Sequence, residues 1–275
     1  MSLILGIDVG GSSTKIIGLY EDGSIQSMLR VHAEDPLTSL YGALGNYLST
    51  NHLALSDLRH IALTGMGTTA VQGNLYGVPT VHVDEFSAIG AGGLHLAKRE
   101  SAIVVSLGTG TAFIWAEQDG TARHLGGSGI GGGTLAGLCS CLVGAQEFRQ
   151  IRKLAADGDL SKVDLLIQDM TDTSITTLPP HMTAANFAKL AEDATPADLT
   201  LGAINLVLQS IGTMCVFACG SCHTNTVVLT GALTTLAQAK DNFALFHQLY
   251  GIDFLLPEHA TFATSIGAAL CSVRK

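Results

Sequence analysis

The sequence predicts an α/β protein of two lobes with related topology, set around a cleft. Two observations carry this prediction. A strand, a glycine turn, a second strand, a hairpin turn and a third strand follow one another in residues 3–31, and the same series returns in residues 101–125. The chain is also apolar enough for a large core, since it has 275 residues, of which 47% are hydrophobic and 13% charged.

The first half of the chain alternates short apolar strands with helical patterns. The predicted strands cover residues 3–9, 15–20, 25–31, 61–64 and 78–83. One helix opens at Pro36 and runs to about residue 48. A second helix follows Asp84, which has the side chain of an N-cap, and continues through Ala97.

The second half repeats the strand series and then becomes mainly helical. Strands are predicted at residues 101–107, 111–117, 122–125, 226–229 and 252–255. Helices are predicted from about residue 134, over 233–249 and from about 261, and residues 145–220 are expected to be largely helical with a turn-rich break at 171–182. The charged seam at Lys98–Glu100 divides the chain into predicted lobes of residues 1–100 and 101–275.

The first glycine turn has the composition of a phosphate site. It lines up a carboxylate, two glycines, three hydroxyls and a lysine: Asp8, Gly10, Gly11, Ser12, Ser13, Thr14 and Lys15. Glycines let consecutive amides point inward at an anion, and the lysine adds a positive charge. Asp8 suits Mg²⁺, bound directly or through water, because this ion binds one or two carboxylates together with substrate phosphates. The alternative is an ordinary hairpin with an aspartate cap.

The second glycine turn, residues 106–111, repeats this combination of glycines and hydroxyls around Thr109. Two such turns facing one another would clamp a triphosphate from both sides. Phosphoryl transfer then needs in-line positioning, charge neutralisation and often a base. Glu85 is the candidate base, with the neighbouring Asp84 as the helix cap. The alternative is that both carboxylates simply stabilise the helix N-terminus.

A glycine-rich stretch follows the second series, with six glycines in residues 126–133. Gly127, Gly129 and Gly132 match a dinucleotide fingerprint, but no acidic strand end follows about twenty residues on. We favour a nucleotide-binding segment at a helix N-terminus, called the lip below, with Gly231 as a further residue that lines the nucleotide site. The nucleotide contacts expected in the lip are Gly131, Gly132, Gly133, Thr134, Leu135 and Ala136.

Charge and hydropathy narrow the classes of partner and location. The formal net charge of −9 argues against binding to nucleic acid or to an anionic membrane surface. Residues 199–222 are strongly apolar, but interrupting polar residues favour a buried helix followed by a strand over a membrane span. The N-terminus lacks a signal-peptide pattern, so we expect a cytoplasmic protein.

Six cysteines are therefore expected to be reduced. Cys215, Cys219 and Cys222 are spaced to share one helix face, where small buried side chains are the favoured interpretation and a zinc or redox site is the alternative. The run from Cys219 to His223 matches a haem-attachment pattern, which we interpret as accidental in a chain that is not exported.

The two glycine turns resemble the phosphate motifs of the actin/hexokinase/Hsp70 superfamily. Four further stretches, in the same order along the chain, resemble type II pantothenate kinases, the group of the staphylococcal and eukaryotic enzymes. These stretches are residues 84–88, 126–138, 157–159 and 183–187. The resemblance implies an α/β fold of two ribonuclease H-like lobes around a nucleotide cleft, of the actin-like ATPase and acetate–sugar kinase type.

The resemblance also implies an activity and a set of partners. It implies ATP-dependent phosphorylation of the terminal hydroxyl of pantothenate, the first step toward coenzyme A, with Mg²⁺ as cofactor and ATP as co-substrate. It implies a homodimer and feedback by coenzyme A or its thioesters. It assigns the catalytic role to Glu85, nucleotide contacts to the residues already named, and an aromatic beside the adenine to Phe148.

The acceptor side departs from the family pattern. His124 stands where the family has arginine, with Arg123 beside it, and Ala112 stands where the family often has serine. Thr109, Ala112, Arg123 and His124 are thus the expected acceptor contacts, and the replacement of arginine by histidine weakens anion binding unless Arg123 reaches the acceptor. The alternatives are a kinase for a pantothenate analogue or an amino sugar, a weakly catalytic regulator that binds nucleotide or acyl-CoA, and an oxidoreductase with a dinucleotide cofactor.

Overall fold

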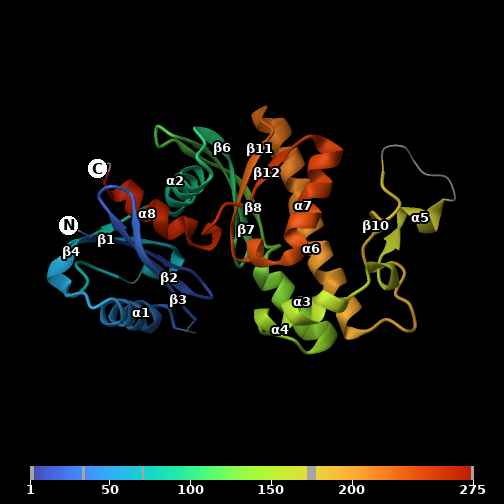
Figure 1. Ribbon diagram of the computed structural model, residues 1–275, viewed down its shortest axis with the longest axis horizontal. Coiled ribbons are helices and arrows are strands. Elements are labelled where there is room, and N and C mark those ends of the chain that lie inside the picture. Colours follow the sequence, from blue (N-terminus) through green and yellow to red (C-terminus); the bar gives the residue numbers. More distant parts are fainter. Residues whose placement is uncertain (1–2, 33–34, 70, 172–177, 274–275) are drawn as a thin grey trace.

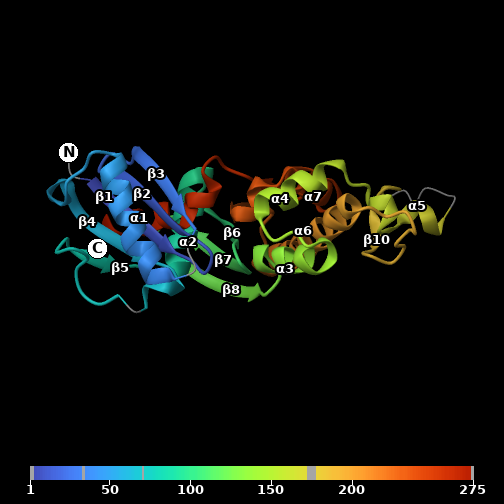
Figure 2. The ribbon, with the colours of Figure 1, turned by 90° about the horizontal axis from the view of Figure 1, so that it is seen from below.

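The computed structural model describes residues 3–32, 35–69, 71–171 and 178–273. Two five-stranded sheets lie on either side of a pair of helices, and the molecule is elongated in both views (Figures 1 and 2). The small sheet of β9 and β10 lies at the end farthest from the first sheet (Figure 1).

The first sheet has the order β3-β2-β1-β4-β5. Its strands are β1 (Leu3–Val9), β2 (Thr14–Tyr20), β3 (Ile25–Val31), β4 (Leu58–Thr64) and β5 (Thr80–His82). Strands β1, β2 and β3 pair antiparallel, whereas β4 lies parallel to β1 and β5 parallel to β4. Helix α1 (Pro36–Thr50) packs its buried face on this sheet through Leu40, Leu44 and Tyr47.

The second sheet repeats this topology, in the order β8-β7-β6-β11-β12 when read from its antiparallel edge. Its strands are β6 (Ser101–Leu107), β7 (Thr111–Glu117), β8 (Ala122–Ser128), β11 (Thr226–Gly231) and β12 (Asp253–Leu255). Strand β6 is antiparallel to β7 and parallel to β11, just as β1 is to β2 and β4. The repeated strand series in the sequence therefore marks two sheets of one design.

Helices α2 (Glu85–Ala97) and α8 (Ala263–Val273) join the two sheets. A Cβ atom on Gly93 would collide with Val104 of the second sheet, and one on Gly6 of the first sheet would collide with the Ser265 carbonyl of α8. The two helices also touch backbone to backbone at Gly92 and Gly267, where no larger side chain fits. The last helix of the chain thus packs on the first sheet, while α2 packs on the second.

The expectation that residues 145–220 are largely helical is wrong before residue 196. This part contains α4 (Phe148–Leu154), α5 (Ile167–Met170) and the strand pair β9 (Leu165–Leu166) and β10 (Thr183–Ala185). A buried carboxylate organises the irregular chain: Asp164 accepts hydrogen bonds from Thr183 Oγ1 at 2.9 Å, Phe187 N at 2.9 Å and Asn205 Nδ2 at 2.8 Å. Within the predicted break at 171–182, residues 172–177 lie outside the described residues.

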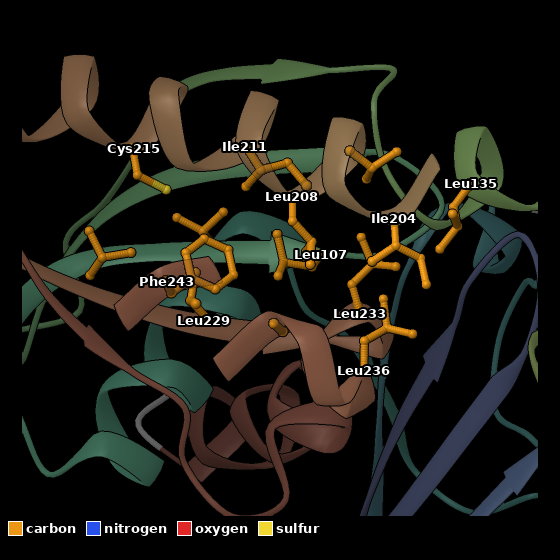
Figure 3. Packing of buried hydrophobic residues seen from close by; sticks show 14 of the residues in the cluster. Leu107, Leu135, Ile204, Leu208, Ile211, Cys215, Leu229, Leu233, Leu236 and Phe243 are labelled. Atoms are coloured by element: carbon orange, nitrogen blue, oxygen red, sulfur yellow. The ribbon is translucent and has the colours of Figure 1, made fainter. Parts of the chain in front are cut away.

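The apolar stretch forms one helix, α6 (Pro196–Cys222), which Thr195 and Asp198 cap reciprocally. It is followed by β11, as expected. The helix is long and apolar enough to cross a membrane, but half of its apolar window is buried inside the protein. Its buried face packs Ile204, Leu208 and Ile211 against Phe243 of α7 (Ala237–Tyr250) and against the second sheet (Figure 3).

The cysteine face of α6 belongs to this core. Cys215 and Cys219 are buried, and Cys222 is partly buried. Burial raises the pKa of the Cys219 thiol to about 11 and also raises that of Cys215, so both thiols are neutral and weakly reactive. Packing therefore accounts for the spacing of these cysteines.

The remaining helices are α3 (Gly132–Val143) and short 3₁₀ turns. The turns cover Leu55–Asp57, Met66–Thr68, Ala155–Asp157, Leu160–Lys162, Ala232–Thr235 and Ala260–Phe262. Helix α3 begins two residues earlier than expected, and β8 continues three residues farther, to Ser128.

Candidate active site

The two glycine turns face each other across the gap between the sheets. A Cβ atom built on Gly11 would lie 3.8 Å from Thr109 Oγ1. The first turn is closed by a hydrogen bond of 3.1 Å from the Gly10 amide to the Ser13 carbonyl. Residues about 100 positions apart in the sequence are thus brought together as the predicted clamp requires.

Asp8 and Lys15 form a largely buried ion pair beside the first turn. They face one another in the β1–β2 register, and Lys15 Nζ lies 2.9 Å from Asp8 Oδ2. Gly65, at φ +94°, packs on the other carboxylate oxygen, since a Cβ there would lie 2.8 Å from Asp8 Oδ1. The lysine expected to reach toward a phosphate is therefore also the partner of this aspartate.

Asp84 and Glu85 have different roles at the start of α2. Asp84 caps the helix by accepting hydrogen bonds from Ser87 N at 2.9 Å and Ser87 Oγ at 2.8 Å. No hydrogen bond or ion pair within the described residues engages the Glu85 carboxylate. Burial raises the pKa of Glu85, the negative charges of Asp8 and Asp84 raise it further, and the charge of Lys15 opposes them. Glu85 thus shares one electrostatic site with the Asp8–Lys15 pair.

The glycine-rich stretch packs α3 onto the second turn. Gly132 N donates to the Gly108 carbonyl at 2.8 Å, and Gly133 N donates to the Thr109 carbonyl at 2.9 Å. A Cβ on Gly131 would lie 2.6 Å from the Thr109 oxygen, so only glycine fits there. The first amides of the helix are therefore engaged by the turn itself and are not an open anion site, which corrects the reason we expected for these glycines.

The other residues of the lip differ in how far they are buried. Leu135 is buried, Thr134 and Ala136 are partly buried, and Gly133 is exposed. Phe148 opens α4 and packs against the same core cluster as Leu135. Gly231, at φ +92°, ends β11 where a Cβ would lie 2.5 Å from the Leu107 carbonyl, close to the start of the second turn.

The dinucleotide interpretation of this stretch is wrong for a topological reason. A dinucleotide fingerprint joins a strand to a helix within a parallel βαβ unit. Here the preceding strand, β8, is an edge strand that runs antiparallel to β7. Of the fingerprint glycines, Gly132 instead serves the contact between α3 and the second turn, where a Cβ would lie 2.9 Å from the Gly108 carbonyl.

The structure separates the two basic residues of the acceptor side. His124 pairs with Ile114 and Arg123 with Trp115, so their side chains leave β8 on opposite faces. The ring of His124 stacks on Phe86 of α2, with ring centroids 4.2 Å apart and an interplanar angle of 6°. Arg123 Nη2 lies 3.8 Å from Cys222 Sγ at the end of α6. His124 and Ala112 both lie on the face of the second sheet that packs against α2, whereas Arg123 lies on the other face.

Comparison with known proteins identifies the family. The family model named Fumble matches residues 97–270, which is more than half of the chain. The chain belongs to the Fumble family. This chain is 29% identical over 279 residues to the type II pantothenate kinase of Oceanobacillus iheyensis, with 98% of this chain and 99% of the relative covered. It is 26% identical over 278 residues to that of Staphylococcus epidermidis, covering 96% and 98%.

Solved structures confirm the predicted fold class of the chain. An activator of 2-hydroxyisocaproyl-CoA dehydratase from Clostridium difficile with bound ADPNP superposes with a TM-score of 0.71 at 16% identity, covering 99% of this chain and 94% of that one. A ROK-family glucokinase from Streptomyces griseus in complex with glucose and AMPPNP gives 0.62 at 14% identity, with both chains fully covered. The predicted two-lobe, actin-like α/β fold is confirmed.

Sequence reasoning does not point to two residues of the candidate site. Phe86 follows the candidate base in the first turn of α2, but its stacking partner His124 lies far along the chain, so no local pattern marks the pair. Gly65 packs on Asp8 at the end of β4, and the glycine directly after a predicted strand was its signal. Both act through tertiary contacts that the sequence does not display.

Proposed function

We propose that this protein transfers the γ-phosphoryl group of ATP to the terminal hydroxyl of pantothenate, giving 4′-phosphopantothenate. The relatives named type II pantothenate kinase, aligned over nearly the whole chain, support the substrate and the reaction. The observation that carries the proposal is the position of Glu85, a carboxylate with a raised pKa in the field of Asp8 and Lys15, beside two facing glycine turns.

The nucleotide contacts follow the two turns and the lip. Asp8 to Lys15 would hold the phosphates from the first sheet, and Thr109 would hold them from the second. Gly131 to Ala136, Phe148 and Gly231 would line the nucleoside side. The first amides of α3 already donate to the second turn. Most of the phosphate binding would therefore come from the backbone of the second turn and from the side chains of Thr109 and Lys15, and little from the helix N-terminus.

The residues present fit a magnesium ion. Asp8 is a buried carboxylate with one oxygen on Lys15, and Mg²⁺ typically binds one or two carboxylates plus substrate phosphates. Across the described part of the chain, no group of three or more His, Cys, Asp or Glu residues is arranged around a metal site, so the nucleotide would supply most of the other ligands. When bound, the ion supplies neutralisation of phosphate charge.

Glu85 would act as the general base. Its raised pKa makes it a stronger proton acceptor than an ordinary surface glutamate. Its carboxylate takes the proton of the acceptor hydroxyl as the oxygen attacks the γ-phosphorus and ADP leaves. Lys15, the ion-pair partner of Asp8, adds a positive charge near the transferring group.

The acceptor side favours a second candidate function, phosphorylation of a related acceptor such as a pantothenate analogue or an amino sugar. The observation behind it is that His124 and Ala112 lie on the face of the second sheet that α2 covers, whereas Arg123 contacts Cys222 on the other face of β8. An exposed imidazole is a weaker anion site than an arginine fork. Pantothenate remains the first choice because the full-length relatives share that name.

The assembly and location of the protein are further parts of the proposal. We infer a homodimer, feedback by coenzyme A or its thioesters and a cytoplasmic location, each supported by the resemblance to type II pantothenate kinases.

Acceptor-dependent ADP release and product mass test this proposal. The wild type is expected to phosphorylate pantothenate, and Glu85→Gln to lose about 10²–10⁴-fold in kcat while it still binds ADP by calorimetry. Glu192→Gln, an exposed glutamate outside the site, is the control. Near-normal turnover of Glu85→Gln contradicts the base assignment. Turnover of an amino sugar with inert pantothenate favours the second candidate, and nucleotide binding without turnover favours a regulator.

A further inference from the structure

Phe86 links the candidate base to the acceptor side. It directly follows Glu85 in the first turn of α2, and its ring stacks on His124 of β8 at 4.2 Å between centroids and 6° between planes. Phe86 is partly buried and packs with the cluster that holds Ile89 and Ala112, and this packing holds its ring in place. His124 is an exposed residue on an edge strand, and the ring of Phe86 covers one face of its imidazole.

The stack directs one nitrogen of His124 along β8. His124 Nε2 lies 3.7 Å from the point where a Cβ on Gly127 would stand, and the Ala112 Cα lies 3.9 Å from the same point. The imidazole nitrogen therefore faces a patch of bare backbone that has no side chain of its own to fill it. β8 runs from the hairpin toward the end of the sheet that holds Thr109, so Nε2 points toward the phosphate turns.

We propose that Phe86 is a positioning residue that holds His124 Nε2 over the acceptor. In this arrangement Nε2 donates a hydrogen bond to a carbonyl or carboxylate oxygen of the acceptor, in the space left open at Gly127. Because Glu85 and Phe86 are consecutive in one helical turn, the base and the acceptor contact keep a fixed relation to each other. The inference rests on the proposed function for the identity of the acceptor.

The simpler account is that Phe86 only fills space beneath α2. The two accounts differ in what a loss of the aromatic ring does. If Phe86 acts through His124, removing the ring weakens acceptor binding only while His124 is present. If Phe86 only packs, its removal lowers stability and kcat whatever residue stands at position 124.

A double-mutant cycle separates these accounts. The variants are Phe86→Leu, His124→Ala and both together, with Phe86→Tyr as the variant that keeps the stack. Steady-state KM for pantothenate, KM for ATP and kcat are measured, and thermal unfolding reports the fold. Phe217→Leu, at an aromatic that is 71% exposed on α6, is the matched control.

We expect Phe86→Leu to raise the KM for pantothenate about tenfold, the cost of one hydrogen bond, and to leave the KM for ATP within twofold. Phe86→Tyr keeps the wild-type KM for pantothenate. In the His124→Ala background, Phe86→Leu does not raise the KM for pantothenate further. Additive effects in the double variant, or an unchanged KM for pantothenate in Phe86→Leu, overturn the inference. If Phe86→Leu does not fold, Phe86→Met, which keeps an apolar side chain of similar size but removes the ring, carries the test with the same expectation. If the wild type does not use pantothenate, the proposed function fails alone and the same cycle is run with the acceptor that ADP release identifies.

Discussion

Lys15 Nζ lies 2.9 Å from Asp8 Oδ2, and the two side chains come from facing positions of β1 and β2. The pair is 15% and 7% exposed, so each charge depends on the other in a site with little water. The first turn is therefore built on an internal ion pair before any nucleotide enters. This pairing places a cation and a carboxylate next to the facing glycine turns and within the field of Glu85.

Removing the lysine is expected to destabilise the fold as well as the site. Lys15→Met leaves the buried Asp8 carboxylate without its partner, which costs roughly 3 kcal/mol of unfolding free energy. Urea unfolding measures this change. The control is Lys189→Met, whose partner Asp169 is exposed, so its loss is expected to change stability little. Equal losses in the two variants would argue that burial of the Asp8–Lys15 pair has no energetic consequence.

The acidic limb of the profile of kcat/KM against pH is expected to shift when the charge of Asp84 is removed. The raised pKa of Glu85 keeps the base protonated to a higher pH than an ordinary glutamate, so kcat/KM rises with pH through that raised pKa. Asp84→Asn keeps an N-cap side chain but removes a negative charge that raises the pKa, and the limb shifts to lower pH. Asp193→Asn, at an ion pair with Lys162 away from the turns, leaves it in place. An unmoved limb in Asp84→Asn would exclude Glu85 as the titrating group.

Glu85→Gln is expected to gain stability as it loses activity. A carboxyl group whose pKa is higher in the folded protein than in the unfolded chain is destabilising when ionised. The gain is therefore present at neutral pH and disappears as the pH falls below the ordinary pKa of glutamate. Chemical unfolding of both proteins at neutral and at acidic pH measures the difference. A variant that is less stable than wild type at neutral pH would contradict the burial assigned to Glu85.

The glycine-rich stretch offers a matched pair of substitutions on one helix. Gly131→Ala brings a methyl group within 2.6 Å of the Thr109 carbonyl, so α3 must move away from the second turn. We expect a loss of about 1–3 kcal/mol in stability and a higher KM for ATP. Gly137→Ala, with nothing within 4 Å of its new methyl group, should be neutral or stabilising by up to about 1 kcal/mol. Similar unfolding curves for the two variants would remove the packing role of Gly131.

The sequence was informative where local pattern decides structure. Alternating apolar residues and glycine turns predicted both strand series, and Asp84 was correctly expected to cap α2. The segment before α6 was misjudged because its order comes from Asp164, whose partners Thr183 and Asn205 are far along the chain. Hydrophobic pattern does not report a buried polar hub of this kind.

The acceptor side shows a second reason why sequence reasoning falls short. Arg123 and His124 leave β8 on opposite faces, so one of them had to face α2. The pairing of β7 with β8 shifts between Phe113 and Ile114 of β7, and Leu125 of β8 is left without a partner in the ladder. This bulge changes which residues of β8 point to each face of the sheet. This irregularity, which the sequence pattern does not display, belongs to the pairing that leaves His124 and not Arg123 against α2.

Transfer of label from γ-labelled ATP to pantothenate tests the central claim most directly. The wild type is predicted to yield labelled 4′-phosphopantothenate, identified by its mass. Glu85→Gln is predicted to yield at least about 100-fold less in the same time, with ADP binding retained. Release of the label only as inorganic phosphate, or equal product from both proteins, would contradict the account of a pantothenate kinase with Glu85 as its base.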